Sequence, residues 1–387
     1  MNHSLPSENI SVIVDTTPLC GEKTGIGNYV HYLLKFLLSN KFNLSMQGVS
    51  FGLHKFQKDS LEIVQQLKHN TRLPIPVRIL NQWWRYFDFP KIDNLISGVN
   101  ILHFTNYYLP PIHSARTVLS VYDLSFLTTP QWVSPQITNL FKPTIARSVQ
   151  RATRIITCSE KSKKDIEKYL NVPGEKISVA YPGIDKTIFH PEEWEEAQDY
   201  IQKHYNVKVP FLLFVGTIEE RKNVIGLLNM FEKIYKQIPH SLVLIGKKGF
   251  KSDEIFLKIQ TMESKDRVFY LDYIQDHSEL RWFYNAADLF VFPSFEEGFG
   301  IPPLEAMACG CPVMVSNQGA LPEVVGPSGI QISPDDMDTF STTILEILNN
   351  AEISAKLKKE GTIQSNKFTW DKTAKVHYEI YKELAEL

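Results

Sequence analysis

Residues 290–316 read FVFPSFEEGFGIPPLEAMACGCPVMVS. The apolar run Leu289–Phe292 indicates a buried strand, and the glycine-flanked segment 296–300 that follows it indicates a loop. The two prolines at 302–303 are tolerated in the first turn of a helix, so a helix is expected directly after the loop. Pro312–Ser316 then predicts a second strand. This stretch therefore predicts a strand–loop–helix–strand unit with its loop at the N-terminus of the helix.

The loop in this unit has the features of an anion site. Free backbone N–H groups and the positive end of the helix dipole favour a ligand such as a phosphate. Glu297 lies on the loop and Glu305 in the second turn of the helix. Carboxylates beside a phosphate can accept hydrogen bonds from hydroxyl groups. This arrangement indicates a phosphorylated ligand that also carries sugar hydroxyls. The alternative is an ordinary capped helix with acidic residues in its first turns.

The whole stretch resembles the Glu-x7-Glu signature of family-4 retaining glycosyltransferases, which have the GT-B fold. By this resemblance Glu297 faces the transferred hexose and Glu305 binds the ribose of the nucleotide. The resemblance also implies that the main-chain amides of Gly298, Phe299 and Gly300 hold the hexose and the diphosphate.

A second segment, residues 216–223 (GTIEERKN), follows the first predicted strand of the C-terminal half. Arg221 and Lys222 are predicted to open a helix, where two cations and the helix N-terminus would stabilise a departing diphosphate. The segment resembles the family's Gly-Thr-x-x-x-Arg-Lys-Asn element, which begins here with Gly216 and Thr217 and whose Arg and Lys hold the donor diphosphate. The alternative is a solvated Arg-Lys pair on a surface helix.

Two weaker segments complete the expected donor site. Gly25 and Gly27 lie in a glycine loop that lacks the third glycine of a dinucleotide fingerprint, so a tight turn before a helix is the default interpretation. The resemblance suggests a flexible loop that reaches the donor phosphates and sugar. Tyr273 and Ile274 match the place where relatives bind the base through main-chain groups. Asp272 stands where the family usually has glycine.

Polar residues at two strand ends are assigned to the acceptor side. Asp123 follows the predicted strand 117–122, where many relatives have His-Asp; this chain has Tyr122, which puts in doubt any mechanism that needs the imidazole. Asp123 can also simply cap a turn. His103 ends another strand, and a structural hydrogen-bonding role is the alternative for it. The predicted catalytic residues are Glu297, Asp123, Arg221 and Lys222.

Composition limits the class of protein. The 387 residues suggest two domains, and 43% hydrophobic with 22% charged residues is typical of a globular protein. No apolar run approaches the roughly 18 residues of a membrane span, and Met1–Asn9 shows no secretory signal. The cysteines lack metal-ligand spacing, so a reducing, cytoplasmic location is expected. They are Cys20, Cys158, Cys309 and Cys311.

Charge is unevenly distributed along the chain. Residues 1–190 hold 21 Lys and Arg against 13 Asp and Glu, or +8, and the remainder holds 20 against 30, or −10. A basic half suits peripheral contact with an anionic membrane or a lipid-linked acceptor, and ordinary surface variation is the alternative. The aromatic and basic segment Asn81–Phe87 can contact lipid or cover the core as a helix, the second being favoured. No nucleic-acid motif is present.

Alternating strands and helices predict two parallel, doubly wound sheets. By the resemblance, the fold class is α/β, GT-B, with two Rossmann-like domains facing a central cleft. The expected domains are an acceptor-binding domain (1–190), a donor-binding domain (191–368) and a final helix that returns to the first domain (369–387). The predicted strands include Ile10–Asp15, Val49–Phe51, Ile101–Phe104, Arg154–Thr157, Ile177–Ala180, Phe211–Val215, Leu242–Ile245 and Val268–Tyr270.

The resemblance implies a retaining transferase that moves a hexose from a nucleotide sugar. Because the similarity is greatest to bacterial mannosyltransferases of surface-polysaccharide assembly, the expected donor is GDP-mannose and the expected acceptor a glycan or a lipid-linked glycan. A UDP-hexose donor and a non-catalytic sugar-nucleotide-binding protein are the alternatives. A nicotinamide oxidoreductase is disfavoured, since the glycine fingerprint is incomplete. No metal or other cofactor is expected, because cationic side chains and a helix dipole neutralise the diphosphate.

Overall fold

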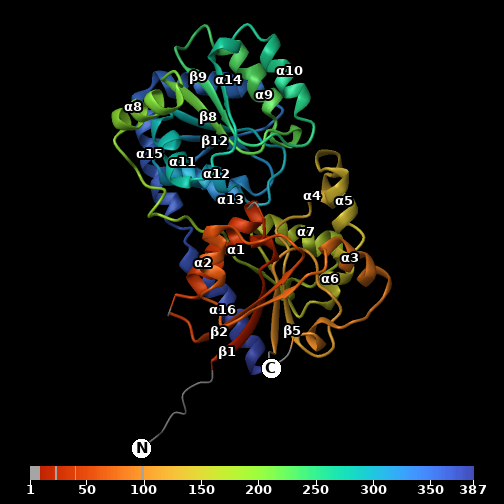
Figure 1. Cartoon of the computed structure of the whole chain (residues 1–387). Coiled ribbons are helices and arrows are strands. Elements are labelled where there is room, and N and C mark those ends of the chain that lie inside the picture. The colour runs from red at the N-terminus through yellow and green to blue at the C-terminus, as the bar shows by residue number, and fades with distance from the viewer. Residues whose placement is uncertain (1–8, 22–23, 40, 97–99) are drawn as a thin grey trace, which may run out of the picture. The chain divides into compact units, whose positions relative to one another are not determined.

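The computed structural model of the chain describes residues 9–21, 24–39, 41–96 and 100–387 (Figure 1). Residues 1–8, where no secretory signal is expected, and residues 22–23 of the glycine loop lie outside these ranges. The chain forms two compact units. The N-terminal unit comprises residues up to Leu127, Pro135–Gly183 and Trp370–Leu387, and the C-terminal unit comprises Thr128–Ser134 and Ile184–Thr369.

The N-terminal unit is built on a seven-stranded sheet with the order β3-β2-β1-β4-β5-β6-β7, in which every pairing is parallel. Residues of β4 are buried throughout, as expected for a strand covered on both faces. The strands are β1 (Ile10–Asp15), β2 (Leu44–Phe51), β3 (Asn70–Leu73), β4 (Ile101–Phe104), β5 (Arg116–Ser120), β6 (Arg154–Thr157) and β7 (Ile177–Val179).

The C-terminal unit has a six-stranded sheet with the order β10-β9-β8-β11-β12-β13, again parallel throughout. Its central strands are continuous apolar runs that are fully buried, and these supply the core of the unit. The strands are β8 (Phe211–Val215), β9 (Ser241–Ile245), β10 (Val268–Leu271), β11 (Leu289–Phe292), β12 (Val313–Ser316) and β13 (Ile330–Ile332).

Helices flank both sheets (Figure 1). None of those in the described residues combines the length and apolar character needed to span a bilayer. In the N-terminal half they are α1 (Gly25–Leu37), α2 (Lys58–Val64), α3 (Val77–Tyr86), α4 (Ser125–Thr128), α5 (Pro135–Phe141), α6 (Ile145–Arg151) and α7 (Glu160–Leu170). The rest are α8 (Trp194–Tyr205), α9 (Val224–Ile234), α10 (Asp253–Thr261), α11 (His277–Ala286), α12 (Ile301–Ala308), α13 (Leu321–Val325), α14 (Met337–Asn349), α15 (Ala351–Ser365) and α16 (Trp370–Glu386).

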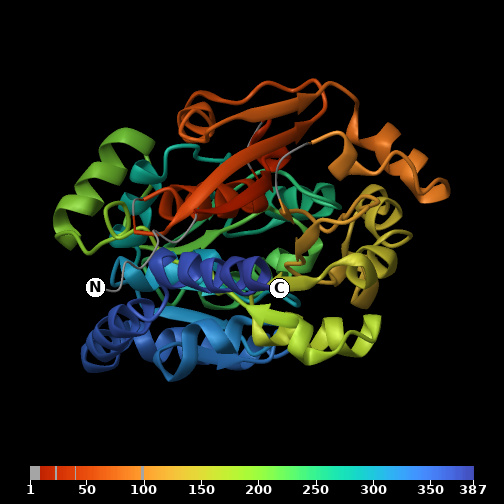
Figure 2. The same cartoon turned by 90° about the horizontal axis from the view of Figure 1, so that it is seen from below.

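The final helix, α16, packs in the N-terminal unit, although it comes last in the sequence. It lies beside the red strand β1 in Figure 2 and contacts α1, β1 and β4. The ring of Trp370 stacks on Tyr32 at a centroid distance of 5.2 Å and meets Tyr29 edge to face at 5.4 Å. These contacts bury one face of α16 against the first sheet.

The structure confirms the prediction of two parallel, doubly wound sheets and corrects several details. Strands β3 and β13 were not predicted, because both are short and lie at sheet edges. Helix α1 begins at Gly25, earlier than the predicted start at Asn28. In α3, the predicted core-covering role holds for Trp84, which is 3% exposed, but not for Trp83 or Tyr86, which are 50% and 71% exposed.

Candidate functional site

The carboxyl ends of two neighbouring strands in the C-terminal unit carry most of the predicted donor-site residues. The sheet order reverses between β8 and β11, which pair with each other. Loop 216–222 follows β8 and loop 293–300 follows β11. Ligands of open α/β sheets bind at such a switch point. These two loops and α12 carry Gly216, Thr217, Arg221, Lys222, Glu297, Gly298, Phe299, Gly300 and Glu305.

Arg221 and Lys222 do not open a helix, which corrects the sequence prediction. They end a 3-10 turn, Glu220–Lys222. Asn223 follows with a left-handed backbone (φ 55°) and caps α9 by accepting a hydrogen bond from the backbone N–H of Gly226 at 3.2 Å. The backbone N–H of Phe295 donates to the carbonyl of Arg221 at 2.9 Å, so the turn is attached to the loop after β11.

Glu297 joins the two loops through a network of charged groups. Lys222 Nζ donates to Glu297 Oε1 at 2.5 Å, and Arg221 Nη1 lies 3.4 Å from Glu297 Oε2. The guanidinium of Arg221 also donates to Glu219 Oε1, at 2.8 Å from Nη2 and 3.1 Å from Nε. Ser294 Oγ donates to Glu297 Oε1 at 2.7 Å. Two carboxylates therefore balance two cations, and each acid has a defined partner.

Burial and charge oppose each other at Glu297 and Lys222. Both residues are only 8% exposed. Burial alone would raise the pKa of Glu297, but the charges of Lys222 and Arg221, with hydrogen bonds from Lys222 and Ser294, hold it below its ordinary value. Burial lowers the pKa of the Lys222 ammonium, and Glu297 opposes that effect. Because a buried charge is costly without its partner, Glu297 and Lys222 stabilise each other's ionised form.

A close approach of two backbone segments fixes the position of Glu297. Gly319 has φ 62°, and a Cβ atom there would lie 2.6 Å from the backbone N and 2.7 Å from the carbonyl O of Glu297. The backbone N–H of Ala320 donates to the same carbonyl at 3.0 Å. Ser316 Oγ donates to the carbonyl of Ser294 at 2.5 Å. Only glycine fits at position 319 without moving the loop that carries the carboxylate.

The N-terminus of α12 offers fewer donors than an ordinary helix. Gly300 is its cap residue, with φ 115°, and Pro302 and Pro303 lie in its first turn, as predicted. Proline has no backbone N–H, so the first turn retains the donors of Ile301 and Leu304 alone among its first four residues. The helix tip by itself therefore offers few main-chain donors to an anion. Phe299 is 5% exposed and packs on Phe368, so its side chain belongs to the core.

Glu305 lies in the second turn of α12, as predicted, and is buried. Its Oε2 accepts a hydrogen bond from Tyr284 OH of α11 at 2.8 Å. Burial raises the pKa of Glu305 from 4.5 to about 7, and the Tyr284 hydrogen bond opposes this rise. Tyr284, which the sequence reasoning missed, is fully buried and fixes the direction of the Glu305 carboxyl.

Tyr273 and Ile274 lie in the loop after β10, at the same edge of the sheet. The carboxylate of Asp272 accepts a hydrogen bond from the backbone N–H of Tyr273 at 2.7 Å. That backbone N–H is one of the main-chain groups expected to contact a base. In this structure it is already hydrogen-bonded to Asp272. Lys247, which follows β9, places its ammonium 4.6 Å from the centre of the Tyr273 ring, a contact that the sequence did not predict.

The glycine and acceptor-side candidates lie in the N-terminal unit. Gly25 and Gly27 are in the first turn of α1, where Thr24 Oγ1 accepts from the backbone N–H of Gly27 at 3.4 Å, so a helix start replaces the predicted loop. Asp123 Oδ1 accepts from the backbone N–H and the hydroxyl of Ser125, at 2.9 Å and 2.8 Å, and thus caps a turn. Tyr122 is buried, with its hydroxyl donating to Thr105 O at 2.9 Å.

The environment of His103 fits the structural alternative instead of an acceptor contact. The side chain is completely buried. Its Nδ1 lies 2.7 Å from Tyr381 OH of α16, and its Nε2 lies 2.9 Å from Ser120 Oγ. Burial lowers the pKa of His103 well below its ordinary value, with a smaller effect from His377. With both ring nitrogens occupied inside the protein, His103 links the first sheet to α16.

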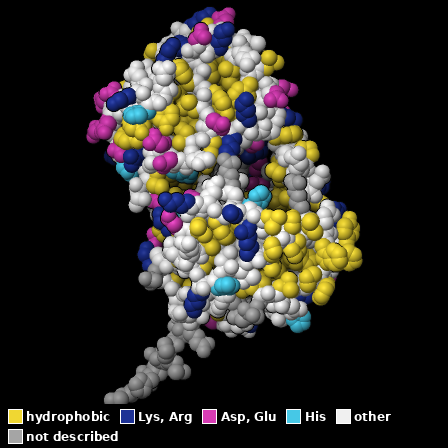
Figure 3. Space-filling model, in the orientation of Figure 1, with side chains coloured by type: hydrophobic (Ala, Val, Ile, Leu, Met, Phe, Trp, Pro, Cys, Tyr) yellow, Lys and Arg dark blue, Asp and Glu magenta, His cyan; other side chains and the backbone are white. Residues whose placement is uncertain are grey.

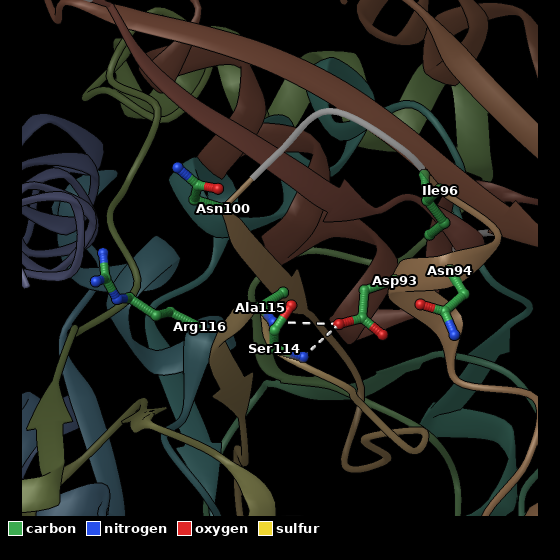
Figure 4. A pocket seen from close by; sticks show the side chains of 7 residues that line it. All are labelled: Asp93, Asn94, Ile96, Asn100, Ser114, Ala115 and Arg116. Carbon is green, nitrogen blue, oxygen red and sulfur yellow. Dashed lines mark hydrogen bonds between the residues drawn. The ribbon is translucent and has the colours of Figure 1, made fainter.

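A pocket of about 280 Å³ lies at the opposite, amino edge of the first sheet (Figure 4). Asn100 and Arg116 line it where β4 and β5 begin. The Asp93 carboxylate on its wall accepts backbone N–H groups of Ser114 and Ala115 at 2.7 Å and 3.1 Å, so this acid has a structural role. In the part of the chain that the structure describes, no group of three His, Cys, Asp or Glu residues is arranged to hold a metal ion.

Both halves of the chain match known families. Residues 196–364 match the family described as glycosyl transferases group 1, and residues 23–187 match glycosyltransferase family 4. The chain is similar to O-antigen chain mannosyltransferase B of Escherichia coli, with 32% identity across 97% of this chain and 100% of the relative. It is also 29% identical to O-antigen chain mannosyltransferase RfbU of Salmonella typhimurium, across 68% of this chain and 70% of that protein.

A solved structure with the same fold is the sucrose-phosphate synthase of Thermosynechococcus elongatus. Its TM-score is 0.76, with 21% identity, and the match covers 97% of this chain and 99% of that one. At this level of identity the similarity concerns the fold, which is the GT-B arrangement of two Rossmann-like domains.

The glycine contact at position 319 predicts the effect of one added methyl group. Gly319→Ala should lower the free energy of unfolding by about 1–3 kcal/mol, because the new Cβ meets the Glu297 backbone at a left-handed φ. Gly25→Ala is the matched control, since a Cβ there has nothing within 4 Å. Urea unfolding of both variants measures the difference, and equal stability of the two would show that the loop yields without cost.

The raised pKa of Glu305 predicts a specific dependence of stability on pH. The folded protein binds the Glu305 proton more tightly than the unfolded chain does, so the associated stability is present below pH 4.5 and is lost as pH rises to about 7. Glu305→Gln should remove this decline, which amounts to up to about 3 kcal/mol. The control is Glu346→Gln at an exposed site. Chemical denaturation at several pH values checks it, and an unchanged decline in Glu305→Gln would disprove the assignment.

Proposed function

The chain belongs to the retaining hexosyltransferases of glycosyltransferase family 4, and on this basis we propose that it transfers mannose from GDP-mannose. The proposed acceptor is a glycan or a lipid-linked glycan in surface-polysaccharide synthesis. The observation that carries the proposal is the cluster of Arg221, Lys222 and Glu297 at the switch point of the second sheet, where both cations lie within reach of one carboxylate.

The cluster supports a division of roles at the donor. Arg221 and Lys222 carry the positive charge that a departing GDP needs, and the amides at 298–300 supply neutral donors. The Glu297 carboxylate accepts hydrogen bonds from the hexose hydroxyls. It remains ionised because the two cations keep its pKa low. Glu305, aligned by Tyr284, binds the ribose. When the diphosphate binds, it shares the cations with Glu297.

The proposed reaction keeps the anomeric configuration of the hexose. The bond between the anomeric carbon and the diphosphate oxygen breaks while the acceptor oxygen forms its bond on the same face. The departing diphosphate oxygen takes the proton of the acceptor hydroxyl, so GDP leaves as the protonated product. In this scheme the side chains stabilise charge and hold geometry, and no imidazole is needed where the chain has Tyr122 in place of histidine.

Asp272 supports guanine over uracil as the base. It precedes Tyr273 and Ile274, the pair that matches the base-binding position of relatives, and it is exposed. Guanine presents two neighbouring N–H donors on its Watson–Crick edge, whereas uracil presents one. A carboxylate accepts hydrogen bonds only, so it complements the guanine edge better. This support rests on residues where the chain departs from the family's usual glycine.

We place the reaction at the cytoplasmic face of a membrane. The described cysteines are all free thiols, which suits a reducing compartment. The acceptor side is proposed to be the N-terminal unit, which contains Asp123 and Tyr122, and the donor side the C-terminal unit.

A panel of nucleotide sugars tests the donor. GDP-mannose should raise the melting temperature most and should release GDP on addition of acceptor, and EDTA should leave this release unchanged because Arg221 and Lys222 supply the positive charge. Preference for a UDP-hexose would identify the alternative donor. A thermal shift without release of nucleotide in the presence of any acceptor would favour a non-catalytic sugar-nucleotide-binding protein. Loss of activity with EDTA would contradict the assignment of the positive charge to Arg221 and Lys222.

Glu297→Ala and Arg221→Ala should each reduce transfer at least about a hundredfold, the scale of one preorganised electrostatic contact. The two variants should differ in binding GDP. Arg221→Ala should weaken it because a cation is lost. Glu297→Ala removes the carboxylate partner of Lys222 and leaves Arg221 paired with Glu219, so it should leave GDP binding as tight or tighter. Transfer kinetics and calorimetry with GDP measure the two effects.

The control for this comparison is Glu263→Ala, which removes an exposed ion pair with Lys236. Near-normal turnover in both site variants would show that the roles are misassigned. Weaker GDP binding by Glu297→Ala would show that the carboxylate organises the cations instead of competing for them.

A further inference from the structure

Helix α3 and the chain that follows it present a continuous apolar surface to solvent. The side chains of Ile79, Trp83, Tyr86, Phe87 and Phe89 are 59%, 50%, 71%, 54% and 68% exposed. We call these five residues the aromatic ridge. Figure 3 shows hydrophobic side chains gathered over this part of the N-terminal unit. Scattered exposed apolar residues are ordinary, but a contiguous cluster of large ones marks an interaction site.

Among the described side chains of α3, that of Trp84 is the buried one; it anchors the helix, and the ridge faces outward. Trp84 is 3% exposed, and its Nε1 donates to the carbonyl of Pro90 at 3.0 Å. Its ring stacks on Tyr108 at 6.1 Å and meets Phe51 edge to face at 6.3 Å. The Trp83 ring instead packs on Phe87 at 4.7 Å, within the ridge itself. Trp84 therefore attaches α3 to the core, whereas the other large hydrophobic side chains of the ridge remain exposed to solvent.

The border of the ridge is basic. The Arg85 guanidinium lies 5.7 Å from the centre of the Tyr86 ring, and residues 79–89 contain one acid, Asp88. Asp88 is paired, since Lys91 Nζ lies 2.5 Å from its Oδ2 and Arg151 contacts its Oδ1. Arg147 is exposed and donates to the carbonyl of Arg85 at 2.9 Å, which places a further guanidinium beside the helix. The acid is thus neutralised and the net charge around the ridge is positive.

We propose that the aromatic ridge docks this protein on an anionic lipid bilayer, with α3 lying at the boundary between headgroups and acyl chains. Tryptophan and tyrosine are the side chains enriched at that boundary. A helix with an apolar face and a basic border binds there through buried apolar area and attraction to anionic headgroups. A protein partner or a second copy of the chain would have to match both the aromatic face and the positive border.

The inference rests on the proposed function only for the lipid-linked acceptor, which would be held at the same surface. The contact itself depends on the ridge, and not on which sugar is transferred. Vesicle binding and donor turnover can therefore fail independently, and each is measured separately.

Co-sedimentation of the full chain with vesicles tests the proposal. The protein should bind phosphatidylglycerol-rich vesicles more tightly than phosphatidylcholine vesicles, and high salt should reduce the difference. The variant Ile79→Ser/Tyr86→Ser/Phe87→Ser should lower the partition coefficient by about tenfold or more, since it removes apolar area that enters the bilayer. Its melting temperature and its GDP release with a water-soluble acceptor should stay unchanged.

The matched control is Leu257→Ser/Ile363→Ser, which removes two side chains that are 61% and 55% exposed in the C-terminal unit. This control should bind vesicles as the natural chain does. Failure of the natural chain to bind either vesicle, or equal binding by the ridge variant, would overturn the proposal. A dimer that the ridge variant alone abolishes, without a change in vesicle binding, would make the ridge a contact between copies. Loss of donor turnover with vesicle binding intact would overturn the proposed function only.

Discussion

One carboxylate held between two cations is the interaction on which the C-terminal site depends. Glu297 lies on the loop after β11, whereas Arg221 and Lys222 lie on the loop after β8, so the ion pairs tie the ends of two adjacent strands together. Buried charges of this kind are stable only when each has a counter-ion, because removal of one charge leaves its partner buried and unpaired. The charges of this cluster are therefore balanced within the protein.

Backbone geometry shapes the loop beside this network, where we propose that the diphosphate binds. The two prolines in the first turn of α12 remove N–H donors from the helix tip, so the proposed diphosphate site relies on the amides of residues 298–300. Gly319 holds that loop from behind through contacts that leave no space for a side chain. A site assembled from main-chain donors keeps its shape because the surrounding strands fix it, and preorganised dipoles of this type are effective in stabilising developing charge.

The N-terminal unit contains two groups of aromatic side chains, one buried in its core and one exposed to solvent. Inside it, Tyr381 of α16 meets His103, and Trp370 stacks on Tyr32, so the end of the chain is part of the first core. Outside it, the aromatic ridge of α3 and the residues after it remains exposed, whereas Trp84 is buried. The interior contacts hold the final helix in place, whereas the exterior residues are available to a partner.

Local sequence determined the sheet class and most central strands, because Phe211–Val215 and Leu289–Phe292 are unbroken apolar runs that only a strand covered on both faces explains. The proline and glycine pattern likewise predicted α12. The resemblance of the preceding loop to the family-4 signature identified Glu297 as a candidate site residue. The edge strands β3 and β13 were missed, since their short, partly polar sequences carry no such pattern. Only the tertiary structure decided that Glu297 pairs with Lys222, 75 residues away, that His103 is enclosed by Tyr381, 278 residues away, and that α3 turns its aromatic face outward. The physical reason is that strand and helix signals are local, whereas the partner of a charge or a ring is set by how distant segments pack.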